Sequence, residues 1–266
     1  MEYFVDSEDC RLHVTRTGSG PVLLLIHGVA CDSSFFQKTS EYLSGRYTVI
    51  SYDRRGYSLS AAGADASYSA KVQAADALRI LDQAGCRRAC VAACSAGGIV
   101  ALELARRYPE RVEKLFLHET PLAADPQIQG AFDAYLERLR AAAARYNTAR
   151  AMLILLQAVG GADPAAEPVS FEQQGRNMKN YELFLYHEME EFLSYGRAHP
   201  GMRPEMPCVL ASGEDDREGL FSKYAPAAAE SLGCRYMRTP GCHNLAWDRP
   251  REFARCLMEA LEPAEP

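Results

Sequence analysis

The sequence predicts an α/β fold: a mostly parallel central sheet flanked by helices, with an all-helical cap inserted after the strand ending near His118. Three observations support this. Short apolar runs alternate with amphipathic helical segments over the first 120 residues, and the same alternation returns after residue 200. Residues 121–200 hold helical stretches and no clear strand pattern. We therefore expect a core made of residues 1–120 and 201–266, and a helical cap, or lid, made of residues 121–200.

The elements of the first part follow one another regularly. The polar alternation of residues 2–6 and 11–17 indicates a β-hairpin. The apolar run Val22–Ile26 is typical of a central strand buried on both faces. The remaining strands are expected over residues 47–52, 88–93 and 112–118, and the helices over residues 33–43, 69–84 and 97–108.

The later elements are mostly helical until the strand pattern resumes. Inside the insert, helices are expected over residues 132–146, 148–159 and 171–195. The core then continues with strands over residues 208–212 and 234–238, and with helices over residues 219–232 and 250–261. The helical pattern is clearest over residues 250–261, where the apolar residues recur at the spacing of one helical face.

Composition excludes several function classes. The net charge of −6 gives no basic surface for nucleic acid or an anionic membrane. The N-terminus lacks a signal-peptide pattern, and no apolar stretch approaches the ~20 residues of a membrane span. The nine cysteines follow no metal-binding or disulfide framework. We therefore expect a cytoplasmic protein with a small-molecule substrate, no metal and no organic cofactor.

The strongest local signal is a serine at a predicted strand-to-helix turn. Ser95 lies in the segment Ala93-Cys94-Ser95-Ala96-Gly97, with small residues at the positions two before and two after it. Such a turn strains the backbone and leaves room only for small neighbours, while it exposes the hydroxyl beside a helix N-terminus. This pattern is typical of a nucleophilic serine, although a tight turn with a capping serine would look similar.

Other chemically capable residues follow the ends of predicted strands. His27-Gly28-Val29, Gly213-Glu214-Asp215-Asp216 and Gly241-Cys242-His243 each come directly after one. In open α/β sheets, ligands bind at the carboxyl ends of the strands. A serine, an acid and a histidine in this chain order are the order of a hydrolase triad on such a sheet.

Together these motifs resemble the α/β-hydrolase fold family over nearly the whole chain. The helix after the nucleophile keeps the family spacing S-x-G-G-x-x-A-x-x-x-A-x-x-x-P, from Ser95 to Pro109. The family loop D-x-R-G-x-G-x-S is present as Asp53, Arg55, Gly56 and Ser60, with Ser58 in place of the second glycine. The resemblance specifies the fold strongly and the substrate weakly, because this fold hosts many reactions.

The resemblance implies a role for each member of the triad. Ser95 is the expected nucleophile and His243 the base that accepts its proton. Asp216 is the favoured acid, with Asp215 one residue away and Glu119, at another strand end, as alternatives. The backbone N–H groups of two further residues, Val29 and Ala96, are expected to form the oxyanion hole.

The substrate pocket and a competing nucleophile complete the set of candidates. Phe35, Phe36 and Leu245 are candidate substrate contacts, although the two phenylalanines could equally bury their own helix. Cys94 also has small neighbours, but the glycine and proline spacing downstream fits a nucleophile at position 95.

The predicted function is that of a serine hydrolase that cleaves a small, largely apolar ester or related acyl compound through an acyl-enzyme. A C–C bond hydrolase, a perhydrolase or an acyltransferase would use the same triad and cap. A catalytically silent binding protein on the same scaffold is disfavoured by the intact triad candidates. Epoxide hydrolases and dehalogenases of this fold use an aspartate nucleophile, so Ser95 argues against them.

Overall fold

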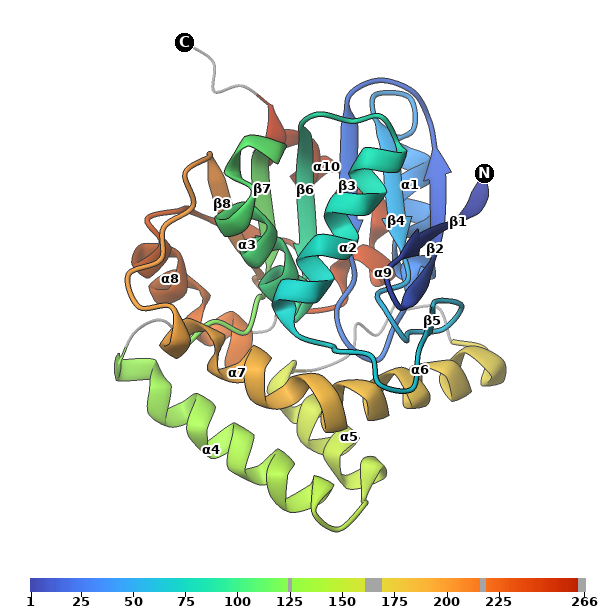
Figure 1. The fold of residues 1–266 in the computed structure, drawn as a ribbon. Helices are drawn as coiled ribbons and strands as arrows, with labels where there is room; N and C mark the ends of the chain where they lie inside the picture. Colours follow the sequence, from blue (N-terminus) through green and yellow to red (C-terminus); the bar gives the residue numbers. More distant parts are fainter. Residues whose placement is uncertain (124–125, 161–168, 216–218, 263–266) are drawn as a thin grey trace.

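The structure is a computed structural model that describes residues 1–123, 126–160, 169–215 and 219–262 (Figure 1). Its nine-stranded sheet has the strand order β1-β2-β4-β3-β6-β7-β8-β9, and the short β5 pairs with β2. The strands β1 and β2 run antiparallel to their neighbours, whereas β4-β3-β6-β7-β8-β9 are mutually parallel. The predicted fold class is confirmed.

The strands lie close to their predicted positions. Their bounds are β1 Glu2–Ser7, β2 Cys10–Thr17, β3 Val22–Ile26, β4 Thr48–Tyr52, β5 Ala61–Ala62, β6 Ala89–Cys94, β7 Val112–His118, β8 Cys208–Gly213 and β9 Arg235–Thr239. Only β5 was not expected. Parallel order brings the carboxyl ends of β3, β4, β6, β7, β8 and β9 to one edge of the sheet, where ligands of open α/β folds bind.

The sheet is buried on both faces, as the apolar run in β3 predicts. Leu24 and Ile26 belong to one core cluster, and Leu23 and Leu25 to the other. The first cluster lies under α2 (Ala70–Gln83), α3 (Gly97–Arg107) and α8 (Leu220–Leu232), and the second under α1 (Gln37–Leu43) and α10 (Pro250–Leu261) (Figure 1). Alternate side chains of one strand thus fix the sheet between two helical layers.

The described part of the insert is helical. It consists of α4 (Pro126–Ala143), α5 (Thr148–Ala158), α6 (Phe171–Leu183), a π-helical turn (Phe184–Glu188) and α7 (Met189–Ala198), which gather at one end of the sheet (Figure 1). The predicted continuous helix over 171–195 is wrong in one respect, because the π turn interrupts it. That turn places the Glu188 carboxylate, with no exposed surface, among buried polar groups of the core.

Smaller differences have local causes. The predicted helix over 33–43 is a 3-10 turn (Ser33–Phe36) followed by α1, because the Asp32 side chain accepts a hydrogen bond from the Ser34 amide and starts the turn there. The four-residue α9 (Leu245–Asp248) was not expected, and α4 begins six residues before the predicted Phe132. None of the described helices is long and apolar enough to span a membrane.

Candidate active site

Ser95 lies at the tight turn that the sequence predicts, between β6 and α3. Its backbone φ is +53°, a left-handed conformation that non-glycine residues adopt rarely. A Cβ on Gly97 would lie 2.5 Å from the carbonyl oxygens of Ile26 and His27, and one on Gly28 would lie 2.9 Å from the Ser95 Cβ. The small residues are therefore required by the close approach of β3 and the turn.

Two backbone amides at the cavity are candidates for an oxyanion hole. Among the described residues, no acceptor is bonded to the N–H of Val29 or of Ala96. Ala96 directly precedes α3, where the helix dipole favours negative charge. Val29 comes from the loop after β3, which the missing Gly28 side chain allows to lie against Ser95. These are the two amides that the sequence predicts.

His27 fixes that loop from beneath. Its Nε2 accepts a hydrogen bond from the Arg54 amide at 2.9 Å, so the proton of the neutral ring is on Nδ1. Nδ1 then donates to the Gly28 carbonyl oxygen at 2.9 Å. Complete burial and the nearby Arg54 charge lower the pKa of His27 to about 4, so the ring stays neutral near pH 7.

The carboxylate joined to His243 is that of Glu119. His243 Nδ1 donates to Glu119 Oε2 at 2.6 Å, and the Gly213 amide donates to Oε1 at 2.9 Å. Glu119 follows β7 with a φ of +46° and has no exposed surface. Burial alone would raise its pKa, but the hydrogen bond and charge of His243 hold the pKa of Glu119 below its usual range. The acid is therefore ionised where it can orient the imidazole.

This geometry favours Glu119 over Asp216, the acid that we expected from the sequence. Asp216 falls outside the described residues. Its neighbour Asp215 is half exposed and forms an ion pair with Arg249, with 3.3 Å between Oδ2 and Nη2. Glu119 was only the third candidate, because the usual family position lies after the strand that follows the insert. The sequence places Glu119, Asp215 and Asp216 all after strand ends, and it carries no signal that ranks Glu119 first.

Ser95 and His243 line one cavity of roughly 240 Å³. Its wall is largely apolar, and the cap contributes much of it, including Met152, Leu155, Leu156 and Val159 from α5 and the residue that follows it. Phe35 lines the cavity as expected. Phe36 and Leu245 do not: both are buried in the core, where Phe36 stacks on Phe253 at 6.3 Å between ring centroids.

Two cysteines also line the cavity, and neither is activated. Burial raises the pKa of Cys31 to about 12. Burial and the neighbouring Cys31 raise the pKa of Cys94 well above its ordinary value. Both side chains therefore remain neutral thiols near pH 7, which makes them poor nucleophiles. This environment supports Ser95 rather than Cys94 as the nucleophile.

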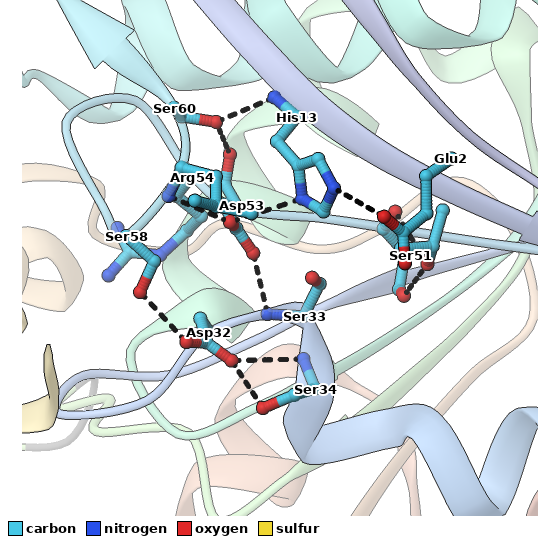
Figure 2. A network of polar contacts seen from close by, with 12 residues as sticks. Glu2, His13, Asp32, Ser33, Ser34, Ser51, Asp53, Arg54, Ser58 and Ser60 are labelled. Atoms are coloured by element: carbon cyan, nitrogen blue, oxygen red, sulfur yellow. Dashed lines mark hydrogen bonds and ion pairs between the residues drawn. The ribbon is translucent and has the colours of Figure 1, made fainter. Parts of the chain in front are cut away.

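A polar network ties the loop after β3 to the loop after β4 (Figure 2). Asp53 accepts hydrogen bonds from the amides of Ser33 at 2.9 Å and Leu59 at 3.1 Å, and Asp32 accepts one from the Ser58 hydroxyl at 2.8 Å. Within the described ranges, no three His, Cys, Asp or Glu side chains are grouped so as to hold a metal ion. The hydrogen bonds of Asp32 and Asp53 support the loop that carries Val29.

Comparisons with known proteins agree with this architecture. The family model described as the alpha/beta hydrolase fold matches residues 21–249. The uncharacterized hydrolase YraK of Bacillus subtilis is 28% identical over 260 residues, which are 94% of this chain and 92% of that protein. RutD of Caulobacter vibrioides, provisionally named a carbamate hydrolase, is 30% identical over 135 residues, about half of each chain.

A solved structure shows the same fold at low identity. A protein of Nostoc sp. is similar with a TM-score of 0.79 and 20% identity, covering 99% of this chain and 98% of its own. The parallel sheet and the turn at Ser95 agree with this family. Because the family model also spans most of the chain, this chain belongs to the alpha/beta hydrolase fold family and is a hydrolase of that superfamily.

Proposed function

We propose that the protein is a serine hydrolase that cleaves a small, largely apolar ester or related acyl compound with a Ser95–His243–Glu119 triad. The observation that carries this proposal is the 2.6 Å hydrogen bond from His243 Nδ1 to the buried Glu119, beside a strained Ser95 that lines the same cavity as His243. Glu119 replaces Asp216 as the proposed acid.

Each group has a defined step. With Nδ1–H held by Glu119, His243 Nε2 has a free lone pair and accepts the proton of the Ser95 hydroxyl as that oxygen attacks the substrate carbonyl. The carbonyl oxygen becomes negative and accepts hydrogen bonds from the N–H groups of Val29 and Ala96. His243 then donates the proton to the leaving group as its bond to the acyl carbon breaks. Water next attacks the acyl-enzyme while His243 accepts its proton, and His243 returns that proton to Ser95 Oγ as the acid product leaves.

The cavity supports the substrate class. A volume of roughly 240 Å³ with an apolar wall favours a short or medium acyl chain over a large polar one. The cap residues Met152, Leu155 and Leu156 would contact that chain, so the cap would set the specificity. Polar groups at the cavity, from Gln173 and Asn177 of α6, would contact a polar end of the substrate.

A chain-length series of p-nitrophenyl esters, from acetate to decanoate, tests this proposal. We expect hydrolysis with a maximum below the longest chains, and its loss in a Ser95→Ala variant. Cys94→Ala is the matched control, because Cys94 is the preceding residue and lines the same cavity, and it should retain activity. Hydrolysis that depends on Cys94 and not on Ser95 would refute the proposal.

A p-nitrophenyl carbamate belongs in the same panel because of the name that the Caulobacter relative carries. Carbamate turnover above ester turnover would move the substrate class while leaving the triad in place. If no ester, carbamate or serine-directed probe modified the protein, the result would favour a catalytically silent binding protein.

A further inference from the structure

Arg54 is a fully buried arginine that contacts both the cap and the loop of the oxyanion hole. Its side chain has no exposed surface. Nη1 donates to Glu188 Oε1 at 2.8 Å and to Gln73 Oε1 at 2.7 Å, and Nη2 donates to Glu188 Oε2 at 3.2 Å. Nη2 also donates to the Gly28 carbonyl oxygen at 3.0 Å. The triad uses none of these groups.

The bond to Gly28 bears on catalysis through peptide geometry. The Gly28 carbonyl and the Val29 N–H belong to one planar, trans peptide unit, so they point in opposite directions. Two donors hold the carbonyl, Arg54 Nη2 at 3.0 Å and His27 Nδ1 at 2.9 Å. Fixing the carbonyl therefore fixes the direction in which the Val29 N–H points. Rotation of this peptide would remove that donor from the oxyanion.

Glu188 in turn holds Arg54, and it belongs to the cap. It ends the π-helical turn that interrupts the cap helix, and it has no exposed surface. Besides Arg54, it accepts hydrogen bonds from Tyr57 Oη at 2.7 Å and from Gln73 Nε2 at 2.7 Å. A buried carboxylate with this many donors has one stable position. The π turn is what brings a charged residue of the cap to that position.

We propose that Arg54 is a positioning residue that aims the Val29 N–H into the cavity, and that Glu188 of the cap holds Arg54 in place. Through Glu188 and Arg54, the cap thereby adds to the support that His27 gives the Gly28 carbonyl. This inference rests on the proposed function, because Val29 is assigned as an oxyanion donor there.

A second buried ion pair in the same loop provides a matched control. Arg55 Nε donates to Asp76 Oδ2 at 2.6 Å and Nη2 to Asp76 Oδ1 at 2.8 Å, and both side chains are almost fully buried. This pair connects the loop to α2 inside the core, and the bonds of Arg55 go to Asp9, Ser67 and Asp76. It should therefore have a similar structural role without a connection to Gly28 or to the cap.

The test compares two double variants that remove one buried charge pair each. Tyr57 and Gln73 donate to different oxygens of Glu188, so Arg54→Met with Glu188→Gln leaves one amide oxygen for one of these two donors. Arg55→Met with Asp76→Asn leaves an amide oxygen for Ser7. Removing both charges together avoids an unpaired buried charge, so both proteins should fold. Kinetics with a p-nitrophenyl ester are compared at matched folded fraction, measured by circular dichroism.

We expect kcat of the Arg54/Glu188 variant to fall about 10- to 100-fold. Complete loss of one oxyanion donor costs about 10²- to 10³-fold, and the loss should be smaller here because His27 still holds the Gly28 carbonyl. KM and the pH of half-maximal kcat should change little, since neither substituted side chain lines the cavity or contacts the base. The Arg55/Asp76 variant should keep kcat within about threefold. Equal losses in the two variants, or an unchanged kcat in the first, would overturn the inference.

A single variant tests the same inference if the Arg54/Glu188 double variant does not fold. Arg54→Lys keeps a positive charge for Glu188 but lacks the second N–H branch that reaches Gly28, so it should show the same selective loss of kcat. Wild-type kcat in that variant would also overturn the inference. The proposed function fails separately, if the wild-type protein shows no hydrolysis that depends on Ser95.

Discussion

Replacing Glu119 by glutamine tests the assignment of the acid, and the structure indicates how large the effect should be. The Gly213 amide donates to Oε1 at 2.9 Å, so the substituted side chain would keep its oxygen there and turn its NH2 group toward His243. An NH2 group donates to Nδ1, which moves the imidazole proton to Nε2. In that tautomer His243 Nε2 carries the imidazole proton and has no lone pair to accept the proton of Ser95.

The productive orientation remains accessible, at a cost. Turning the amide leaves the buried Gly213 N–H facing another donor, which costs about 1–3 kcal/mol. Loss of the charged partner of the imidazole adds about 1–2 kcal/mol. The sum of about 2–5 kcal/mol corresponds to a fall in kcat/KM of about 30-fold to about 5 × 10³-fold, at about 1.36 kcal/mol for each factor of ten. The equivalent amide substitution in chymotrypsin-type proteases lowers turnover about 10⁴-fold.

The assay is ester hydrolysis at matched folded fraction, with Asp215→Asn and Asp216→Asn as comparisons. Asp215→Asn should stay near wild type, because its half-exposed carboxylate pairs with Arg249. If Asp216→Asn loses more than 10³-fold while Glu119→Gln stays within tenfold, the reasoning from the hydrogen bond of His243 is refuted.

Three further predictions concern the triad, its turn and the attachment of the cap. Ser95→Ala and His243→Ala should each lower kcat by several orders of magnitude, and the double variant should be hardly worse than either single variant. Stopped assays on the three proteins check this, and additive losses would contradict a concerted triad. Gly28→Ala should lower kcat at least about tenfold with an intact circular dichroism spectrum, since the new Cβ would lie 2.9 Å from that of Ser95, and a wild-type rate would contradict this contact. Glu103 in α3 accepts a hydrogen bond from Tyr195 of α7 at 2.6 Å, and although burial would raise the pKa of Glu103, its arginine and tyrosine partners lower it to about 2. The ionised Glu103 therefore stabilises the fold by roughly 1–2 kcal/mol, after allowance for the partly exposed arginines. This stabilisation is complete above about pH 5 and is lost as the pH falls toward 2. Urea unfolding of the wild type and of Tyr195→Phe is measured from pH 7 to pH 3. The free energy of unfolding should fall as the pH falls, and a higher value at pH 3 than at pH 7 would contradict the prediction.

Much of the fold is predictable from local patterns. The run Val22–Ile26 reads directly as a strand buried on both faces, and the two clusters that share its side chains confirm this. The turn at Ser95 is predictable for the same reason, because only small residues fit two positions from a strained φ. Both features leave a local pattern in the sequence, an apolar run and a set of small residues, even though the approach of β3 that requires Gly97 is a distant contact.

Features that depend on distant contacts are not predictable in this way. The interruption of the cap helix at 184–188 has no glycine or proline to signal it, and it is explained only by the buried bonds of Glu188 to Arg54, Tyr57 and Gln73. The partner of His243 depends on which strand end lies opposite it in space. Phe36 and Leu245 are apolar residues beside the site, and only the three-dimensional packing shows that they face the core.

Labelling with a fluorophosphonate probe, followed by intact-mass measurement and peptide mapping, tests the central claim most directly. The probe phosphonylates an activated serine with loss of fluoride, and its phosphoryl oxygen, which carries partial negative charge, would accept hydrogen bonds from the amides of Val29 and Ala96. We predict one adduct, on Ser95, that Ser95→Ala abolishes and Cys94→Ala leaves in place. The absence of an adduct in the wild-type protein, or an adduct that persists in Ser95→Ala, would contradict the proposal of a serine hydrolase with Ser95 as its nucleophile.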